Sequence, residues 1–327
     1  MLQSAQNMAG APRAQGSQLA HTWRLVRWEL FLAWRRALSK VLIGILIVGF
    51  ALVVAIVVVA YVVTSGNPDS QAAAPAISQQ LTFPNALLLG GIYAARIGPL
   101  LVSILAGVLI GSEYGYSTQR LAFSRGVGRG QMLAAQVGAL GTVALATSLV
   151  SMLLAALVGV TVGPVFGGTI AAPAAGGWQE ITTYTLVLSL ILFVYSLLAL
   201  FFATLGRSVW TGVGLSLGWL LVEGFVSGIF QLLGTAPGAV FKFIGHIPDW
   251  FLGVNTTALK IATSSSPLNF AFLDNPTGAS SGGGGGGPVL NPTALITGTH
   301  ALLVVLGYGV IFVGLSYWLL RVRDVTD

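Results

Sequence analysis

The sequence predicts an all-α, polytopic membrane protein with six transmembrane helices, and its composition supports that fold class. Hydrophobic residues make up 55% of the 327 residues and charged residues only 7%, whereas a soluble domain carries about 25% charged residues. A protein surface that faces water needs more charged residues than this chain has. Most of the surface of this protein must therefore face lipid. The mean hydropathy of +0.87 indicates the same environment.

An amphipathic helix is predicted ahead of the first membrane-spanning run. Residues 1–17 are small and polar, which is typical of a disordered tail. Over residues 18–40, apolar positions recur at spacings of three and four with basic positions opposite, which predicts a helix in the membrane interface. A loosely ordered basic flank of the first span is the alternative. The apolar positions are Trp23, Val26, Leu30, Trp34 and Ala37, and the basic ones are Arg24, Arg35, Arg36 and Lys40.

Residues 41–327 form one predicted six-span domain. Each apolar run is long enough for the roughly 20 residues that cross a bilayer. Small residues in the fifth run, Gly214, Ser216 and Gly218, predict a close approach of neighbouring helix backbones. The outer loop at about 234–297 contains a first part with enough aromatic residues to pack as a small lid or half-buried helix, and then a run of glycines. The spans are placed at about 41–63, 86–111, 132–161, 181–205, 209–233 and 298–320.

The distribution of basic residues predicts the orientation. All but Lys242, Lys260 and Arg96 of the 15 basic residues lie before the first span, in the second-to-third or fourth-to-fifth connection, or after the last span. Basic residues concentrate on the cytoplasmic side of membrane proteins. Both termini are therefore expected in the cytoplasm, and the high positive charge indicates membrane orientation rather than a nucleic-acid partner.

The chain is not expected to be an enzyme. No lysine follows a glycine, so the phosphate-binding P-loop is absent, and the lack of cysteine excludes thiolate chemistry. Three scattered histidines do not suggest a metal site. Ser216 and His300 should lie at opposite membrane depths, too far apart for a serine-protease pair. No cofactor or metal is expected in this chain.

The connection between the second and third spans carries the most informative motif. An apolar helix ends in a glutamate, a turn of small residues follows, and a short apolar helix leads to a basic turn. Such an element would project into the cytoplasm, with exposed apolar side chains on the short helix and basic residues on either side of it. A docking surface for a soluble partner requires this arrangement. The candidate docking residues are Glu113, Gly115, Thr118, Arg120, Leu121, Phe123, Ser124, Arg125 and Arg129.

On these residues the chain resembles the permease subunit of ABC-2-type transporters. That family commonly shows a glutamate at the cytoplasmic end of span two, a Gly-Thr turn, a leucine-rich short helix and a Ser-Arg-Pro-x-x-Arg-like turn. Here Glu113, Ser124, Arg125 and Arg129 occupy the matching places, Gly126 replaces the proline, and Gly-Tyr-Ser-Thr replaces Gly-Thr. The N-terminal helix, six spans, inside termini and large final outer loop extend the resemblance over nearly the whole chain.

The resemblance implies a transport mechanism. The short helix would be a coupling helix in a groove of a separate ABC ATP-binding subunit, which would hold ATP and Mg. Two such subunits and two permeases, identical or homologous, would work together in a prokaryotic cell membrane. The family favours export, and the scarcity of charge favours an amphipathic or apolar small molecule. A non-transporting ABC-like complex with a sensor, mechanical or regulatory role is the alternative, and an intramembrane enzyme is a further one.

Two charged residues fall within predicted spans, where ionisable groups are candidates for function. Arg96 lies roughly 25 Å above Glu113, and Glu223 lies roughly 24 Å above Arg207. At matching depth they could form an ion pair or jointly line the outer half of a pathway. Alternatively, Arg96 extends to the outer surface and Glu223 bonds to a neighbouring helix.

Overall fold

The structure is a computed structural model whose described part is entirely helical. It describes residues 15–68, 71–116, 124, 126–166, 170, 172–173, 176–234, 239–263 and 296–322. Six helices there are long and apolar enough to cross a membrane, which confirms the predicted number of spans. Even the shortest, at 25 residues, measures roughly 38 Å against a hydrocarbon core of about 30 Å. They are α3 (Ala37–Gly66), α5 (Asn85–Gly115), α7 (Arg129–Thr161), α8 (Gly177–Gly206), α9 (Val209–Gly234) and α13 (Gly298–Val322).

Shorter helices occupy the ends and connections of this bundle. The N-terminal helix precedes α3, two short helices join α3 to α5, and one follows α7. Three more fold the first part of the connection after α9, the aromatic-rich part that was predicted to pack as a small lid or half-buried helix. These elements are α2 (Gln15–Arg35), η1 (Gln71–Ala73), α4 (Ala74–Gln80), η2 (Gly163–Phe166), α10 (Ala239–His246), η3 (Ile247–Trp250) and α11 (Leu252–Thr263).

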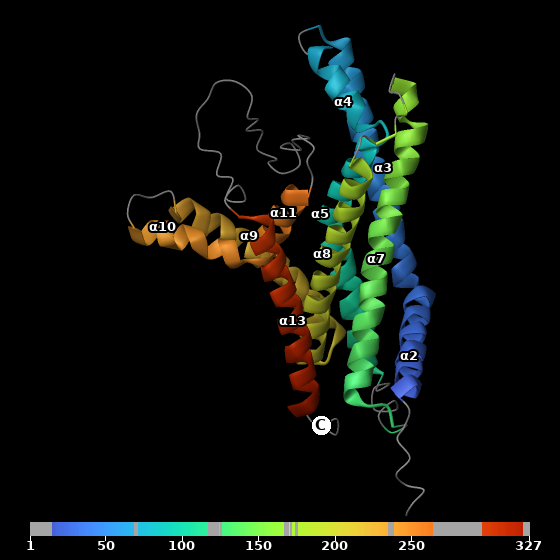
Figure 1. Cartoon of the computed structure of the whole chain (residues 1–327), viewed down its shortest axis with the longest axis vertical. Helices are drawn as coiled ribbons and strands as arrows, with labels where there is room; N and C mark the ends of the chain where they lie inside the picture. The colour runs from blue at the N-terminus through green and yellow to red at the C-terminus, as the bar shows by residue number, and fades with distance from the viewer. Residues whose placement is uncertain are drawn as a thin grey trace, which may run out of the picture.

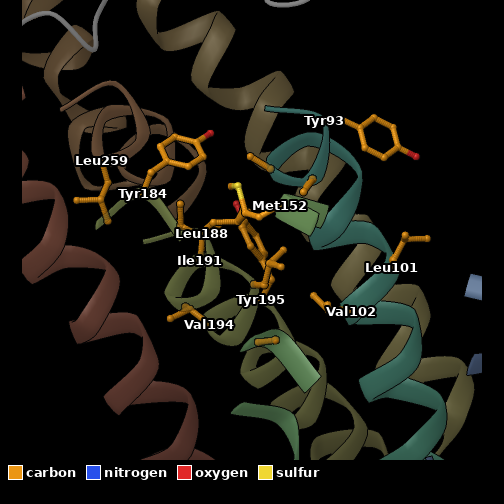
Figure 2. Close-up of a cluster of buried hydrophobic side chains, with 14 of the residues drawn as sticks. Tyr93, Leu101, Val102, Met152, Tyr184, Leu188, Ile191, Val194, Tyr195 and Leu259 are labelled. Atoms are coloured by element: carbon orange, nitrogen blue, oxygen red, sulfur yellow. The ribbon is translucent and has the colours of Figure 1, made fainter. Parts of the chain in front are cut away.

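The helices α5 and α8 form the centre of the bundle. Most of each is buried, whereas most of α3, α9 and α13 is exposed, as expected for helices that face lipid or a partner. Figure 2 shows the core between them, where Leu188 and Ile191 of α8 pack beside Val102 of α5 and Met152 of α7. α9 and α10 contact each other and project together from the side of the bundle in Figure 1.

Close packing between α5 and α9 depends on glycines other than those predicted. A Cβ at Gly111 would lie 2.5 Å from the Val209 Cα, and one at Gly107 would lie 2.8 Å from the Val213 nitrogen. The predicted Gly214 has nothing within 4 Å of such a Cβ, and neither has Gly218. The close approach of a neighbouring helix at Gly214 and Gly218 therefore stays a prediction.

The N-terminal helix packs lengthwise on the bundle. Figure 1 shows α2 alongside the half of α7 that begins at Arg129. Its buried face consists of Val26, Glu29 and Ala33, while Trp23 and Trp34 are exposed. Val26 thus contacts α7, whereas the two tryptophans point away from the protein. The interfacial position of α2 stays a prediction.

The boundaries of the N-terminal segment also differ from the prediction. Residues 1–14 lie outside the described part, but α2 begins at Gln15, inside the predicted tail. The helix does not continue to residue 40, because Arg36 is extended, with φ −71° and ψ 134°, and α3 begins at Ala37. The last predicted residues of the interfacial helix therefore belong to the first span.

Candidate functional site

A cluster of buried polar side chains lies where α5 approaches the docking connection. Glu113, in the last turn of α5, is only 6% exposed and Gln136 of α7 only 2%. The amide Nε2 of Gln136 donates to Glu113 Oε2 at 2.7 Å. The Glu29 carboxyl of α2 is 3% exposed and interacts electrostatically with Glu113 and Arg36. We call Glu29, Arg36, Glu113 and Gln136 the inner polar cluster.

Arg36 supplies the positive charge of this cluster. It stands at the break between α2 and α3, and its Nη1 donates to the Val108 carbonyl of α5 at 3.1 Å. Burial raises the pKa of Glu29 above its ordinary value, and this outweighs the interactions with Glu113 and Arg36, which lower it. A buried carboxyl with a raised pKa tends to hold a proton.

The predicted docking residues divide between described and undescribed positions. Glu113 belongs to the inner polar cluster, Gly115 ends α5 in open space, and Ser124 is exposed. Arg129 takes a different part, because its Nη1 donates to the Leu320 carbonyl at 2.9 Å and to that of Arg321 at 3.2 Å, which joins α7 to the end of α13. Thr118, Arg120, Leu121, Phe123 and Arg125 lie outside the described residues.

A second buried carboxyl lies toward the other end of the bundle. Glu223 of α9 accepts a hydrogen bond from the Trp219 indole at 2.9 Å and another from the Gly253 backbone nitrogen at 2.6 Å. Gly253 is in the first turn of α11, where backbone N–H groups have no partner within the helix. Glu223 therefore serves as an acceptor for the start of α11, and we call Glu223, Trp219 and Gly253 the outer polar site.

The predicted ion pair between Arg96 and Glu223 is not formed. Within the described part of the chain, Glu223 makes no ion pair. Its two carboxyl oxygens accept hydrogen bonds from Gly253 of α11 and from Trp219 of its own helix. This agrees with the alternative in which Glu223 bonds to a neighbouring helix. Arg96 is exposed on α5 and interacts electrostatically with Lys260 of α11. Burial, with a contribution from Arg96, lowers the pKa of Lys260 to about 8. A shared role of Arg96 and Glu223 along a pathway stays a prediction.

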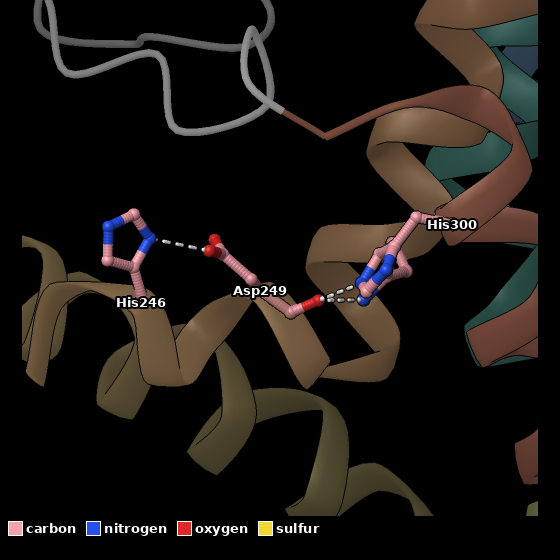
Figure 3. A network of polar contacts seen from close by, with 4 residues as sticks. His246, Asp249 and His300 are labelled. Atoms are coloured by element: carbon pink, nitrogen blue, oxygen red, sulfur yellow. Dashed lines mark hydrogen bonds and ion pairs between the residues drawn. The ribbon is translucent and has the colours of Figure 1, made fainter. Parts of the chain in front are cut away.

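Further polar contacts connect the outer segment to α13. Figure 3 shows His246 Nδ1 against Asp249 Oδ2, at 2.9 Å, and His300 reaching the main-chain oxygen of Asp249, at 3.3 Å. The hydroxyl of Tyr308, also on α13, donates to the Trp250 carbonyl at 3.2 Å. His300 is thus engaged with the η3 turn, and Ser216 donates to its own helix at Val213, so neither forms part of a protease pair.

Two members of the inner polar cluster were missed by sequence reasoning. Glu29 is the one acid in a basic segment, and it shares a helical face with Val26 and Ala33 at spacings of three and four. That spacing was a usable signal, because an acid on a buried face requires a partner. Gln136 falls within the predicted third span and was given no role there.

Comparison with known proteins identifies no relative. No family model matches the chain, and no curated protein matches it. The described residues also contain no group of three or more histidine or acidic side chains placed to hold a metal ion.

Proposed function

We propose that this chain is the permease subunit of an ATP-driven transporter of the ABC-2 class, coupled to a separate ATP-binding subunit through the connection between α5 and α7. The inner polar cluster carries the proposal. It fixes the last turn of α5, at Glu113, to α2 and α7 directly before that connection begins. Hydrogen-bond networks and rigid helices are the elements that transmit force between distant sites.

The arrangement of the helix ends supports the proposed orientation. The start of α7, the connection between α8 and α9, and the end of α13 lie at one end of the bundle in Figure 1. Most basic residues of the sequence belong to the segments that form this end of the bundle. We therefore assign this end to the cytoplasmic side of a prokaryotic cell membrane. Both chain termini would then be cytoplasmic, and the segment containing α10, η3 and α11 would lie toward the outside.

The exposed surface of α9 supports a second permease as a neighbour. Leu221, Val222 and Phe225 are strongly exposed, and Gly214 and Gly218 have open space beside them. Small residues and apolar side chains on an unpacked helix face suit contact with another helix in a membrane. We propose a pair of permeases, identical or homologous, that exports an amphipathic or apolar small molecule.

Affinity purification tests the proposed partner. The tagged chain, cross-linked in its native membrane and purified, should retain a protein with a P-loop and Mg-dependent ATP hydrolysis. Leu121→Asp and Phe123→Asp should abolish retention while leaving membrane insertion intact, because a charge would be placed among the predicted apolar docking residues. Val165→Asp, which places the same charge on the exposed η2 turn, is the control. Retention unchanged by both docking variants would contradict the assignment.

Reconstituted ATP hydrolysis separates transport from the alternative role. The complex in proteoliposomes should hydrolyse ATP faster when amphipathic compounds are added, and it should move them across the bilayer. Hydrolysis that no compound stimulates, with no movement, would favour a non-transporting complex with a mechanical or regulatory role. Failure to retain any ATP-binding protein would contradict both.

A further inference from the structure

The outward face of α2 combines aromatic and basic side chains over residues 23–35. Along one row of residues spaced four apart the two kinds alternate, and a second pair of the same kinds lies beside it. All of these side chains are exposed. Because residues four apart lie on the same side of a helix, they form one continuous surface, which we call the arginine–aromatic face. The first row is Trp23, Arg27, Phe31 and Arg35, and the second pair is Arg24 and Trp28.

The charge on this face has one sign. Arg24, Arg27 and Arg35 bring three exposed guanidinium groups to it. The one acid among residues 1–40 is Glu29, which is 3% exposed and lies on the buried side of the helix. The outward side of α2 is therefore purely basic, which favours an anionic partner.

Two aromatic rings position one of the guanidinium groups. The Cζ of Arg35 lies 4.9 Å from the centre of the Phe31 ring, and the centres of the Phe31 and Trp28 rings are 6.2 Å apart. An arginine stacked on a ring keeps its N–H groups at the edge of the guanidinium plane, where they match two oxygens of a phosphate. Tryptophan rings favour the boundary between lipid and water. A phosphate group attached to a lipid meets both preferences.

The place at which α2 crosses α7 lies near this boundary. α7 has 33 residues and measures roughly 50 Å, so a centred helix extends about 10 Å beyond each side of a hydrocarbon core of about 30 Å. Val26 of α2 packs on Ala135 and Ala139, which lie roughly 9 and 15 Å from the first residue of α7. The crossing is therefore at the edge of the hydrocarbon core, at the level of the phospholipid headgroups.

We propose that the arginine–aromatic face of α2 binds the headgroups of anionic phospholipids in the leaflet at this end of the bundle. The guanidinium groups bind phosphate oxygens, and the rings lie in the interface. α2 leads directly to Arg36, whose Nη1 donates to the Val108 carbonyl of α5. Anionic lipid thus helps to hold α2 in place beside α5. The proposal goes beyond the transport function, because it concerns the lipid around the chain rather than a substrate or an ATP-binding subunit.

Native mass spectrometry of the purified full chain in detergent tests the lipid preference. Phosphatidylglycerol and phosphatidylcholine with the same acyl chains are titrated separately, and the mass of each complex gives the number of lipids bound. The wild type should bind phosphatidylglycerol more tightly, and the preference should shrink as salt is raised, because salt screens exposed charges. Equal affinity for the two lipids would overturn the proposal.

Two triple variants locate the preference on α2. Arg24→Gln, Arg27→Gln and Arg35→Gln together should weaken phosphatidylglycerol binding by about fivefold for each arginine, or roughly 100-fold in all. Phosphatidylcholine binding should stay unchanged, which serves as the check on folding. The matched variant with lysine at the same three positions keeps the charge and should lose only part of the preference. An undiminished preference in the glutamine variant would overturn the proposal.

Two further measurements exclude other anionic partners. Millimolar inorganic phosphate should not displace phosphatidylglycerol, and displacement would overturn the assignment to lipid. If the glutamine variant keeps its lipid preference but loses the ATP-binding subunit during affinity purification, the face is a protein contact and the proposal fails. The lipid titration uses this chain alone, so its failure leaves the proposed transport function standing, and a chain that retains no ATP-binding subunit can still show the lipid preference.

Discussion

The two buried glutamates of the bundle have different surroundings. Glu113 accepts a hydrogen bond from the neutral side-chain amide of Gln136 on α7, whereas Glu223 accepts from the Trp219 indole of its own helix and from the first turn of α11 at Gly253. The same residue type thus joins two long helices at one end of the molecule and anchors a short helix at the other.

The largest effect is expected at the outer polar site. Glu223→Ala would leave two N–H donors without their acceptor, and we expect a loss of stability on the order of 3 kcal/mol. Glu223→Gln keeps an acceptor oxygen and should lose less than half as much. Thermal unfolding of the purified protein in detergent measures both. Equal losses for the two variants would mean that the charge, not the acceptor, holds α11.

The contact between α5, which carries Glu113, and α9, which carries Glu223, should show the next largest loss of stability. Gly111→Ala places a Cβ against the Val209 backbone, and overpacking of this kind costs about 1–3 kcal/mol. Gly307→Ala, on α13 with nothing within 4 Å of the added Cβ, is the matched control and should be neutral or slightly stabilising. The comparison uses thermal unfolding followed by size-exclusion chromatography. An equal loss for both variants would show that the α5–α9 contact is not the source of the effect.

Arg129 offers a smaller effect at the inner end. Arg129→Ala removes two hydrogen bonds to the end of α13, at Leu320 and Arg321, and should lower stability by about 1 kcal/mol. Arg129→Lys should retain part of this stability through one ammonium donor. If Arg129→Ala instead left unfolding unchanged and reduced ATPase binding, the residue would belong to the docking surface, as the resemblance implied.

The smallest expected effect is a change in the pKa of Lys260, which is measured by spectroscopy. The chain has three lysines, Lys40, Lys242 and Lys260, so ¹³C-lysine NMR can follow each ammonium group, with Lys260→Arg assigning the signal. The Lys260 signal should titrate with a pKa of about 8. Because this value is lowered, the folded state is favoured more as pH rises from about 8 toward the ordinary lysine value. Arg96→Gln should raise the pKa, and an unchanged midpoint would exclude Arg96 as a cause.

The spans were predictable because the lipid solvent imposes a local rule on length and composition, and the structure places all six close to their predicted bounds. Contacts between helices were harder to predict from the sequence. The depths of Arg96 and Glu223 were read from residue spacing, but depth along a helix does not give the direction in which a side chain points. Glu223 bonds to α11, which lies in the connection after α9, and residue spacing does not show which helix such a connection will place beside Glu223. Glu29 and Glu113 are far apart in sequence, and only packing brings them together.

The junction between α8 and α9 has a mechanical consequence. Arg207 takes the left-handed conformation, with φ 50°, and α9 begins at Val209, so the two helices are joined without slack. At its other half, α9 holds the first turn of α11 through Glu223. We expect α9 to behave as a lever between the two membrane surfaces: a tilt imposed at the Arg207 end displaces the outer segment directly, and the stiffness of one helix sets the length of the stroke.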